Sequence, residues 1–349
     1  MNINELENLR LKILKEIKDK KFFVILATFI IPIMLLWVFI HTPDDFMEHF
    51  FMYAYAWCGA IIFLSIVRDI QSDVEKGKSV SIKRNIFPFL VFISMPYLTI
   101  NFEKHSIKHV LFFMFVAMTT AYFVIMKHIK EEKINEYIKA FKGKYLKTYF
   151  EKLDYKYEFR GFFELNHILS SGFFRPNEVT GGKDTIYGKI DGVEFGLFDI
   201  DFHKKVSDYL TYGVFFYAEF NKNINSTTFI KSKDSKIKNI RNLQKIIMDN
   251  TEFNDIFDIY SNDIQNAMYI FSPAFMKRIL ELKKWHLDCP INMSFVGNKI
   301  YIFIDTGRDN FEPDINTNAT ITAKTIKVEF SHFLSIVKTL NLNTRIWKI

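Results

Sequence analysis

Three side chains that could bind a metal ion alternate along one predicted strand. Asp199, Asp201 and His203 stand two residues apart, so a strand would place them on the same face. Carboxylate oxygens and an imidazole nitrogen bind divalent cations. However, two carboxylates and one imidazole are fewer ligands than most metal sites require, and a solvated strand face explains the pattern more simply. We therefore expect no metal and no other cofactor, and we name these three residues as the candidate metal ligands.

A basic stretch between residues 231 and 245 could bind an anionic partner. Its cations are Lys231, Lys233, Lys236, Lys238, Arg241 and Lys245, against the single acid Asp234. No aromatic residue interrupts the stretch, which disfavours stacking on single-stranded nucleic acid. Anionic lipid headgroups or another membrane-associated protein would fit the charge, and a solvated loop without a partner would fit it too. The solvated loop is the simplest interpretation, contact with lipid or protein is the alternative, and we expect no nucleic acid.

Three sequence patterns that resemble catalytic motifs lack the spacing or the residues that those motifs require. The glycines before Lys183 lack the spacing of a phosphate-binding loop. Ser170 has no Gly-x-Ser-x-Gly context. Cys289 follows His286 by three residues, but a nucleophile of this kind also needs a third, orienting group. The sequence names no catalytic residue, so we expect binding, and an enzyme with a non-standard site stays open.

Composition excludes several classes of protein. The chain has 349 residues, of which 49% are hydrophobic and 17% aromatic, with a formal net charge of +7. Disordered and collagen-like chains have far fewer apolar residues or far more glycine and proline. The two cysteines exclude a disulfide-rich scaffold and a four-cysteine zinc site.

Apolar residues concentrate in the first third of the chain. A helix needs about 20 residues to cross a hydrocarbon core, within a range of roughly 17–25. Four runs near that length predict transmembrane helices at residues 22–40, 50–67, 86–102 and 110–126. The Lys and Arg counts of the segments around them are 6, 0, 5, 2 and, over residues 127–133, 3, which alternate as the positive-inside rule requires. We therefore expect a multi-pass membrane protein with the lipid bilayer as a partner and both termini in the cytoplasm.

The remaining chain divides into three further regions. Residues 1–21 predict a cytoplasmic N-terminal helix, residues 127–153 a helical connector, and residues 154–349 a soluble domain. Within the domain, Asp191-Gly192 and Gly297-Asn298 predict hairpin turns between strands. The predicted fold class is an α-helical transmembrane region followed by an α+β, mainly antiparallel-sheet cytoplasmic domain.

A short helix is predicted after residue 260. Ser261 or Asn262 is the expected N-cap, with Asp263 in the first turn, where a carboxylate meets free backbone N–H groups. Ala267 is small enough to let this helix approach the sheet closely. Ser272-Pro273 then predicts the start of the next helix.

Several sequence blocks resemble a known family. The blocks are Asp184-x₃-Gly188, Val214–Asn221, Phe257–Pro273, Met293–Gly307 and Phe311-Glu312-Pro313. Their order and spacing resemble the bacterial membrane-anchored family catalogued as domain of unknown function 3137, over about residues 140–313. The resemblance implies membrane helices ahead of an α+β domain at a bacterial inner membrane. It implies no established activity and no catalytic residues.

Together these observations favour a binding protein. The leading expectation is a membrane-associated scaffold or adaptor with a cytoplasmic binding domain. The alternatives are a ligand-responsive membrane sensor and an enzyme with a non-standard site. A pocket with convergent polar groups would favour the alternatives, whereas a flat exposed apolar patch would favour the scaffold.

Overall fold

The computed structural model describes residues 1–30, 107–160, 164–176, 178–203, 210–235, 237, 243–285 and 289–342. These residues belong to two compact units. One unit contains Met1–Glu7 and Ile138–Ile349, and the other contains Asn8–Tyr137. Helices α1 and α5 contribute residues to both units.

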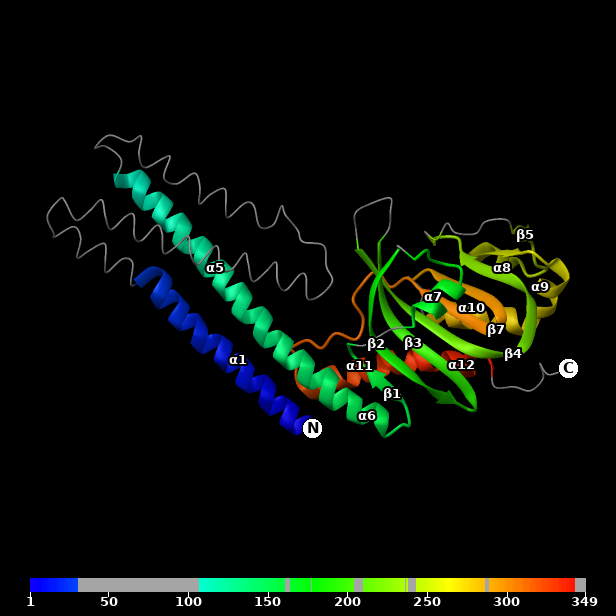
Figure 1. Cartoon of the computed structure of the whole chain (residues 1–349), viewed down its shortest axis with the longest axis horizontal. Helices are drawn as coiled ribbons and strands as arrows, with labels where there is room; N and C mark the ends of the chain where they lie inside the picture. Colours follow the sequence, from blue (N-terminus) through cyan, green and yellow to red (C-terminus); the bar gives the residue numbers. More distant parts are fainter. Residues whose placement is uncertain are drawn as a thin grey trace. The chain divides into compact units, whose positions relative to one another are not determined.

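The unit of residues 8–137 is helical where it is described (Figure 1). Its elements are α1 (Ile3–Ile25), the π-helix η1 (Leu26–Ile30) and α5 (Ile107–Ala140). Lys133 of α5 forms an ion pair with Glu16 of α1, with Nζ and Oε2 2.5 Å apart. The rings of Phe29 and Tyr122 also contact each other, with centroids 5.8 Å apart. These contacts hold the two helices side by side.

The predicted transmembrane region is corrected by the structure. No helix among the described residues is both long enough and apolar enough to cross a membrane. Residues 22–30 of the first predicted span lie in α1 and η1, and the fourth predicted span, 110–126, lies within α5. Residues 31–40 of the first span lie outside the described residues. The predicted spans 50–67 and 86–102 lie outside the described residues.

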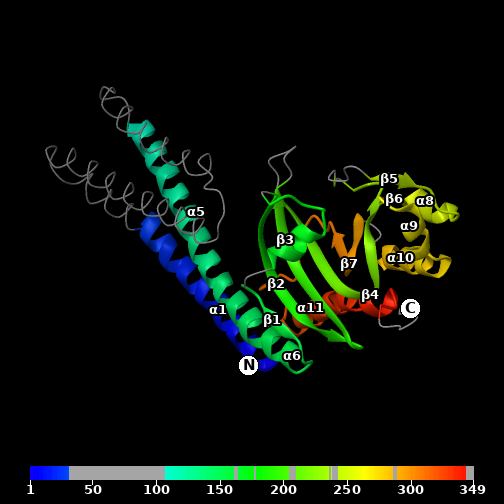
Figure 2. The same ribbon diagram turned by 45° about the vertical axis from the view of Figure 1, so that its right-hand side comes forward.

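The other unit contains a seven-stranded sheet whose pairs are all antiparallel (Figure 2). The strand order is β1-β2-β3-β4-β6-β5, and β7 pairs with β4. The strands are β1 (Lys156–Glu158), β2 (Val179–Ile190), β3 (Val193–His203), β4 (Leu210–Ser232), β5 (Gln244–Ile246), β6 (Phe257–Ser261) and β7 (Ile291–Ile304). The 23-residue β4 is the centre of the sheet, because it pairs with β3, β6 and β7. The predicted α+β, mainly antiparallel class is correct for this unit, although the transmembrane part of that prediction is not.

Two turn predictions have different outcomes. Asp191 and Gly192 have φ angles of 50° and 83°, and they join β2 to β3 in a two-residue turn, as predicted. The hairpin predicted at Gly297-Asn298 is wrong, because β7 continues through both residues. Gly297 also has a positive φ, 62°, but it lies where the β4–β7 register shifts. A bulge and a hairpin turn both favour a glycine with positive φ, so the local sequence did not distinguish them.

Helices cover the sheet and its ends. They are α6 (Lys147–Glu151), α7 (Leu165–Ser170), α8 (Thr251–Ile256), α9 (Ile264–Ile270), α10 (Pro273–Trp285), α11 (Ala319–Leu334) and α12 (Ile336–Thr339). On one face of the sheet, Ile168 of α7 joins an apolar cluster with Phe198 and Phe215. Phe330 of α11 contacts the ring of Tyr157 on β1, with centroids 6.3 Å apart. Both α7 and α11 therefore pack against the sheet.

The N-cap of α9 is Asp263, one or two residues later than predicted. Its carboxylate accepts a hydrogen bond from the backbone N–H of Asn266 at 3.0 Å. Ser261 is buried in β6, and its hydroxyl accepts a hydrogen bond from the backbone N–H of Asp263. Ala267 is fully buried, and α9 packs against β4.

These contacts predict opposite sensitivities for two neighbouring positions. Asp263→Asn should change the unfolding free energy by only a few tenths of a kcal/mol, because Asn caps helices about as well as Asp. Ala267→Leu should cost about 1–3 kcal/mol, since the added methylenes have no space against the sheet. Chemical unfolding of the purified variants measures both values. The reverse ranking would contradict this account of α9.

Candidate functional site

A buried lysine lies in an irregular turn of the helix that enters the domain. Residues Phe141–Leu146 form the π-helix η2, and the N–H of Lys147 bonds to the carbonyl of Lys142, five residues back. Gly143 favours such a departure from α-helical geometry because glycine is a poor helix former. The wider turn changes the direction of the following side chains, and Lys142 is only 1% exposed. π-Helical turns of this kind occur frequently at functional sites.

Lys142 is the centre of a set of polar groups that we name the ionic cluster. Its members are Lys142, Tyr157, Lys183, Asp184, Asp309 and Glu312. The ammonium of Lys142 lies 2.6 Å from Asp184 Oδ2 and 2.7 Å from Glu312 Oε1. Tyr157 donates its hydroxyl to the other oxygen of Asp184. The cluster thereby joins η2, β1, β2 and the segment after β7.

An irregular backbone position places Asp184 in the cluster. Its φ is 50°, in the left-handed region that Asp tolerates better than most residues. The register of β2 against β3 shifts between Lys183 and Ile186, so a bulge turns this side chain inward. Asp184 is fully buried. Burial raises the pKa of Asp184, and Lys142 and Tyr157 act in the opposite direction.

The outer half of the cluster reaches the surface. Lys183 lies 2.6 Å from Glu312 Oε1 and also pairs with Asp309. Burial opposes charge on Lys183, yet Glu312 and Asp309 hold its pKa above the ordinary value. Burial would likewise raise the pKa of Glu312, but Lys142 and Lys183 outweigh it and lower that pKa. Both ammonium groups of the cluster are therefore paired within the protein, two cations against three carboxylates.

Asp199, a candidate metal ligand, bonds to Asn310 instead. It is fully buried and accepts hydrogen bonds from Asn310 Nδ2 at 2.8 Å and from the Asn310 backbone N–H at 3.3 Å. Burial raises the pKa of Asp199 from 3.8 to about 9, against the opposing effect of Asn310. Asn310 thus occupies both carboxyl oxygens of Asp199, and the pair joins β3 to the segment after β7.

The other two candidate metal ligands are only partly described. Asp201 lies two residues further along β3 and is partly exposed, while the side chain of His203 is outside the described part of the structure. Throughout the described ranges, no group of three or more His, Cys, Asp or Glu residues is arranged to hold a metal ion. The prediction that these residues bind no metal is therefore untested at His203.

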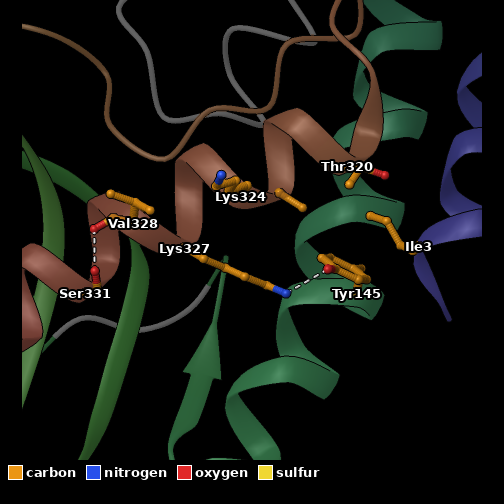
Figure 3. A pocket seen from close by; sticks show the side chains of 8 residues that line it. Ile3, Tyr145, Thr320, Lys324, Lys327, Val328 and Ser331 are labelled. Atoms are coloured by element: carbon orange, nitrogen blue, oxygen red, sulfur yellow. Dashed lines mark hydrogen bonds between the residues drawn. The ribbon is translucent and has the colours of Figure 1, made fainter.

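A groove lies between η2, which carries Lys142 of the ionic cluster, and α11. It has a volume of about 410 Å³ and is lined by η2, by α11 and by Ile3 near the N-terminus. Ala323 and Val328 form apolar walls, and Figure 3 shows Lys327 extending from α11 to the hydroxyl of Tyr145. That hydrogen bond is 2.8 Å long. Because η2 supplies both Lys142 and Tyr145, the ionic cluster fixes one wall of this groove.

The loop before α11 is held against α11 by an ion pair, a hydrogen bond and a ring contact. Glu329 of α11 lies 2.8 Å from Arg308 and accepts the backbone N–H of Phe311 at 3.3 Å. Phe311 has a φ of 58°, and its ring stacks on that of Phe330 at 3.8 Å. A bulky residue rarely adopts positive φ, so packing and Glu329 must hold it there.

The basic stretch is only partly described. Lys231 lies at the end of β4, Lys233 is exposed, and Lys245 of β5 forms an ion pair with Asp258 at 2.8 Å. The hydrogen bond to Asp258 raises the pKa of Lys245. Lys236, Lys238 and Arg241 lie outside the described residues. Contact of this stretch with lipid or protein stays a prediction.

Sequence reasoning did not identify the ionic cluster or the groove. The sequence places Lys142 only within a charged helical connector. The burial of Lys142 depends on the π-helical turn, which contains Gly143. A signal was available in the blocks that carried the family resemblance, because Asp184 and Glu312 belong to two of them. The structure brings these blocks together at Lys142.

Comparison with known proteins tests that resemblance. Residues 211–342 match the family described as protein of unknown function, DUF3137. The resemblance is confirmed over this region. The DUF3137 region contains β4 to α12, including Asn310, Glu312 and Lys327, whereas Lys142 and Asp184 precede it. A bacterial origin stays a prediction.

Two further comparisons add little. A solved structure described as the crystal structure of the mycobacterial trehalose monomycolate transport factor A, TtfA, is 15% identical, with a TM-score of 0.36. The match covers 57% of this chain and 92% of that chain. Similarity at this level identifies neither a shared function nor a shared ligand. Comparison with curated proteins gave no match.

Proposed function

We propose that the domain of residues 138–349 is a ligand-binding module that does not catalyse a reaction, and that its ligand occupies the groove between η2 and α11. The observation that carries this proposal is the groove itself. Its volume of about 410 Å³ lies within the range of roughly 300–1,000 Å³ typical of small-molecule sites. Its apolar walls surround a few convergent polar groups, which is the usual composition of such sites.

The ionic cluster has a supporting role in this proposal. Lys142 and Lys183 each pair with two carboxylates, so their charges are already balanced by the protein. Paired side chains of this kind fix the elements that they join, and a binding site requires rigid support. The cluster therefore positions the groove and does not itself bind the ligand.

A scaffold or adaptor role is the second candidate, and a specific surface favours it. The α9 side chains Ile264, Met268 and Tyr269 are 43%, 44% and 49% exposed. Ile264 and Met268 are four residues apart, so they share one face of the helix. Exposed apolar side chains on one face are a common feature of protein-binding surfaces.

Filling the groove tests the ligand-binding proposal. Ser331 lines the groove and is exposed, so Ser331→Trp should fill the space without disturbing the core. Small molecules from a library of acids, amines and neutral amphiphiles should raise the melting temperature of the full chain. The same molecules should have no effect on Ser331→Trp.

The matched control is Ala274→Trp on α10, which adds the same ring at an exposed position away from the groove. It should respond as the unmodified chain does. Equal shifts in Ser331→Trp and in the unmodified chain would place the ligand elsewhere and refute the proposal.

A further inference from the structure

The groove contains a cation that lacks an acidic partner. Among the residues the structure describes, no carboxylate forms an ion pair with Lys327, and none of the groove-lining residues is acidic. The Lys327 ammonium lies 4.1 Å from the ring centroid of Tyr149 and 4.9 Å from that of Tyr145. One of its three N–H donors goes to the Tyr145 hydroxyl. The other donors remain for a ligand.

The aromatic rings hold this cation in place before a ligand arrives. A cation above two ring faces loses little further freedom when an anion binds. Lys324, one turn earlier on α11, lines the same groove and adds a second positive charge (Figure 3). The electrostatic field in the groove therefore favours an anion.

The apolar walls and the helix end restrict which anion fits. Phosphate groups are commonly bound by several backbone N–H donors together. Three of the first four N–H groups of α11 are already bonded, those of Ala319, Thr320 and Thr322. A single carboxylate needs only the lysine donors, and Ile3, Ala323 and Val328 can contact an apolar chain attached to it.

We infer that the groove binds a carboxylate carried on an apolar chain, with the carboxylate on Lys327 and the chain along Ile3, Ala323 and Val328. At about 30 Å³ for each heavy atom, the groove has room for roughly ten to fourteen of them, which is the size of decanoate. This inference rests on the proposed ligand-binding function and names the chemistry of its ligand.

Calorimetric titration of the full chain tests the inference with four probes below their micelle concentrations. The probes are decanoate, decanol, decyl phosphate and decyltrimethylammonium. Decanoate should bind most tightly, and added salt should weaken its binding. Lys327→Met should weaken decanoate binding about tenfold or more, because it removes a charge-assisted hydrogen bond, while Lys327→Arg should retain most of it.

The control Lys277→Met removes an exposed lysine from α10 and should leave decanoate binding unchanged. If decanol or decyl phosphate binds as tightly as decanoate and Ser331→Trp blocks both, the carboxylate inference is wrong while the ligand-binding function stands. If decanoate binds equally to the unmodified chain, to Lys327→Met and to Ser331→Trp, the carboxylate inference and the proposed ligand-binding function of the groove are both wrong. If no probe binds to the unmodified chain, the inference is wrong.

Discussion

Lys142→Met is expected to lower the unfolding free energy of the domain by about 3–5 kcal/mol. The substitution keeps a side chain of similar length but removes the ammonium that lies within 2.7 Å of both Asp184 and Glu312. Asp184 is fully buried, so without Lys142 it must stay charged in a poorly solvating interior or take up a proton. Both outcomes favour the unfolded chain.

Chemical unfolding at neutral pH measures this loss, with Lys144→Met as the matched control. Lys144 belongs to the same π-helix but is exposed, and its substitution should change the free energy by less than about 0.5 kcal/mol. Adding Asp184→Asn and Glu312→Gln to Lys142→Met should recover most of the loss, because no buried charge then lacks its partner. Equal losses for Lys142→Met and Lys144→Met would show that the ionic cluster does not stabilise the fold.

Asp199→Asn is expected to make the protein more stable than the unmodified chain at alkaline pH. The pKa of Asp199 is about 9 in the folded chain, against 3.8 for an ordinary aspartate. The folded chain therefore binds one more proton than the unfolded chain between these values. The contribution of Asp199 to the unfolding free energy is fully present below pH 3.8. It decreases as the pH rises toward 9, by about 1.4 kcal/mol for each pH unit.

Asn at this position keeps an acceptor for Asn310 but cannot ionise, so the variant should lose this pH dependence. The stability difference between variant and unmodified chain should grow by roughly 5 kcal/mol from pH 5 to pH 9. Thermal unfolding at several pH values measures it, with the exposed Asp249→Asn as the control that should follow the unmodified chain. Parallel pH profiles for Asp199→Asn and the unmodified chain would indicate that Asp199 is ionised in the folded state.

Local sequence patterns predicted the parts of the fold that depend on neighbouring residues. Asp191-Gly192 has the backbone angles of a tight turn, and Pro273 begins α10, as the sequence indicated. The pattern failed at Gly297 because the long strand β4 continues alongside β7, and a partner so distant in sequence leaves no local signal. Apolar runs likewise predicted membrane spans, since run length alone does not say what a helix packs against.

The candidate site was less predictable for the same reason. The burial of Lys142 depends on a π-turn and on two carboxylates that follow 42 and 170 residues later. A lysine in a charged helix normally indicates a solvated surface. The groove depends on Ile3, Tyr145 and α11, three separate parts of the chain, and no spacing rule connects them.

The ionic cluster has a consequence for the order of events during synthesis. A ribosome adds about 5–20 residues per second, so Asp184 follows Lys142 after roughly 2–8 s, and Glu312 after roughly 10–30 s. Lys142 can therefore meet Asp184 early, but the nascent domain lacks its second carboxylate until residue 312 has left the ribosome. Helix α11 (Ala319–Leu334) follows Glu312, so the groove can form only after every member of the ionic cluster has emerged.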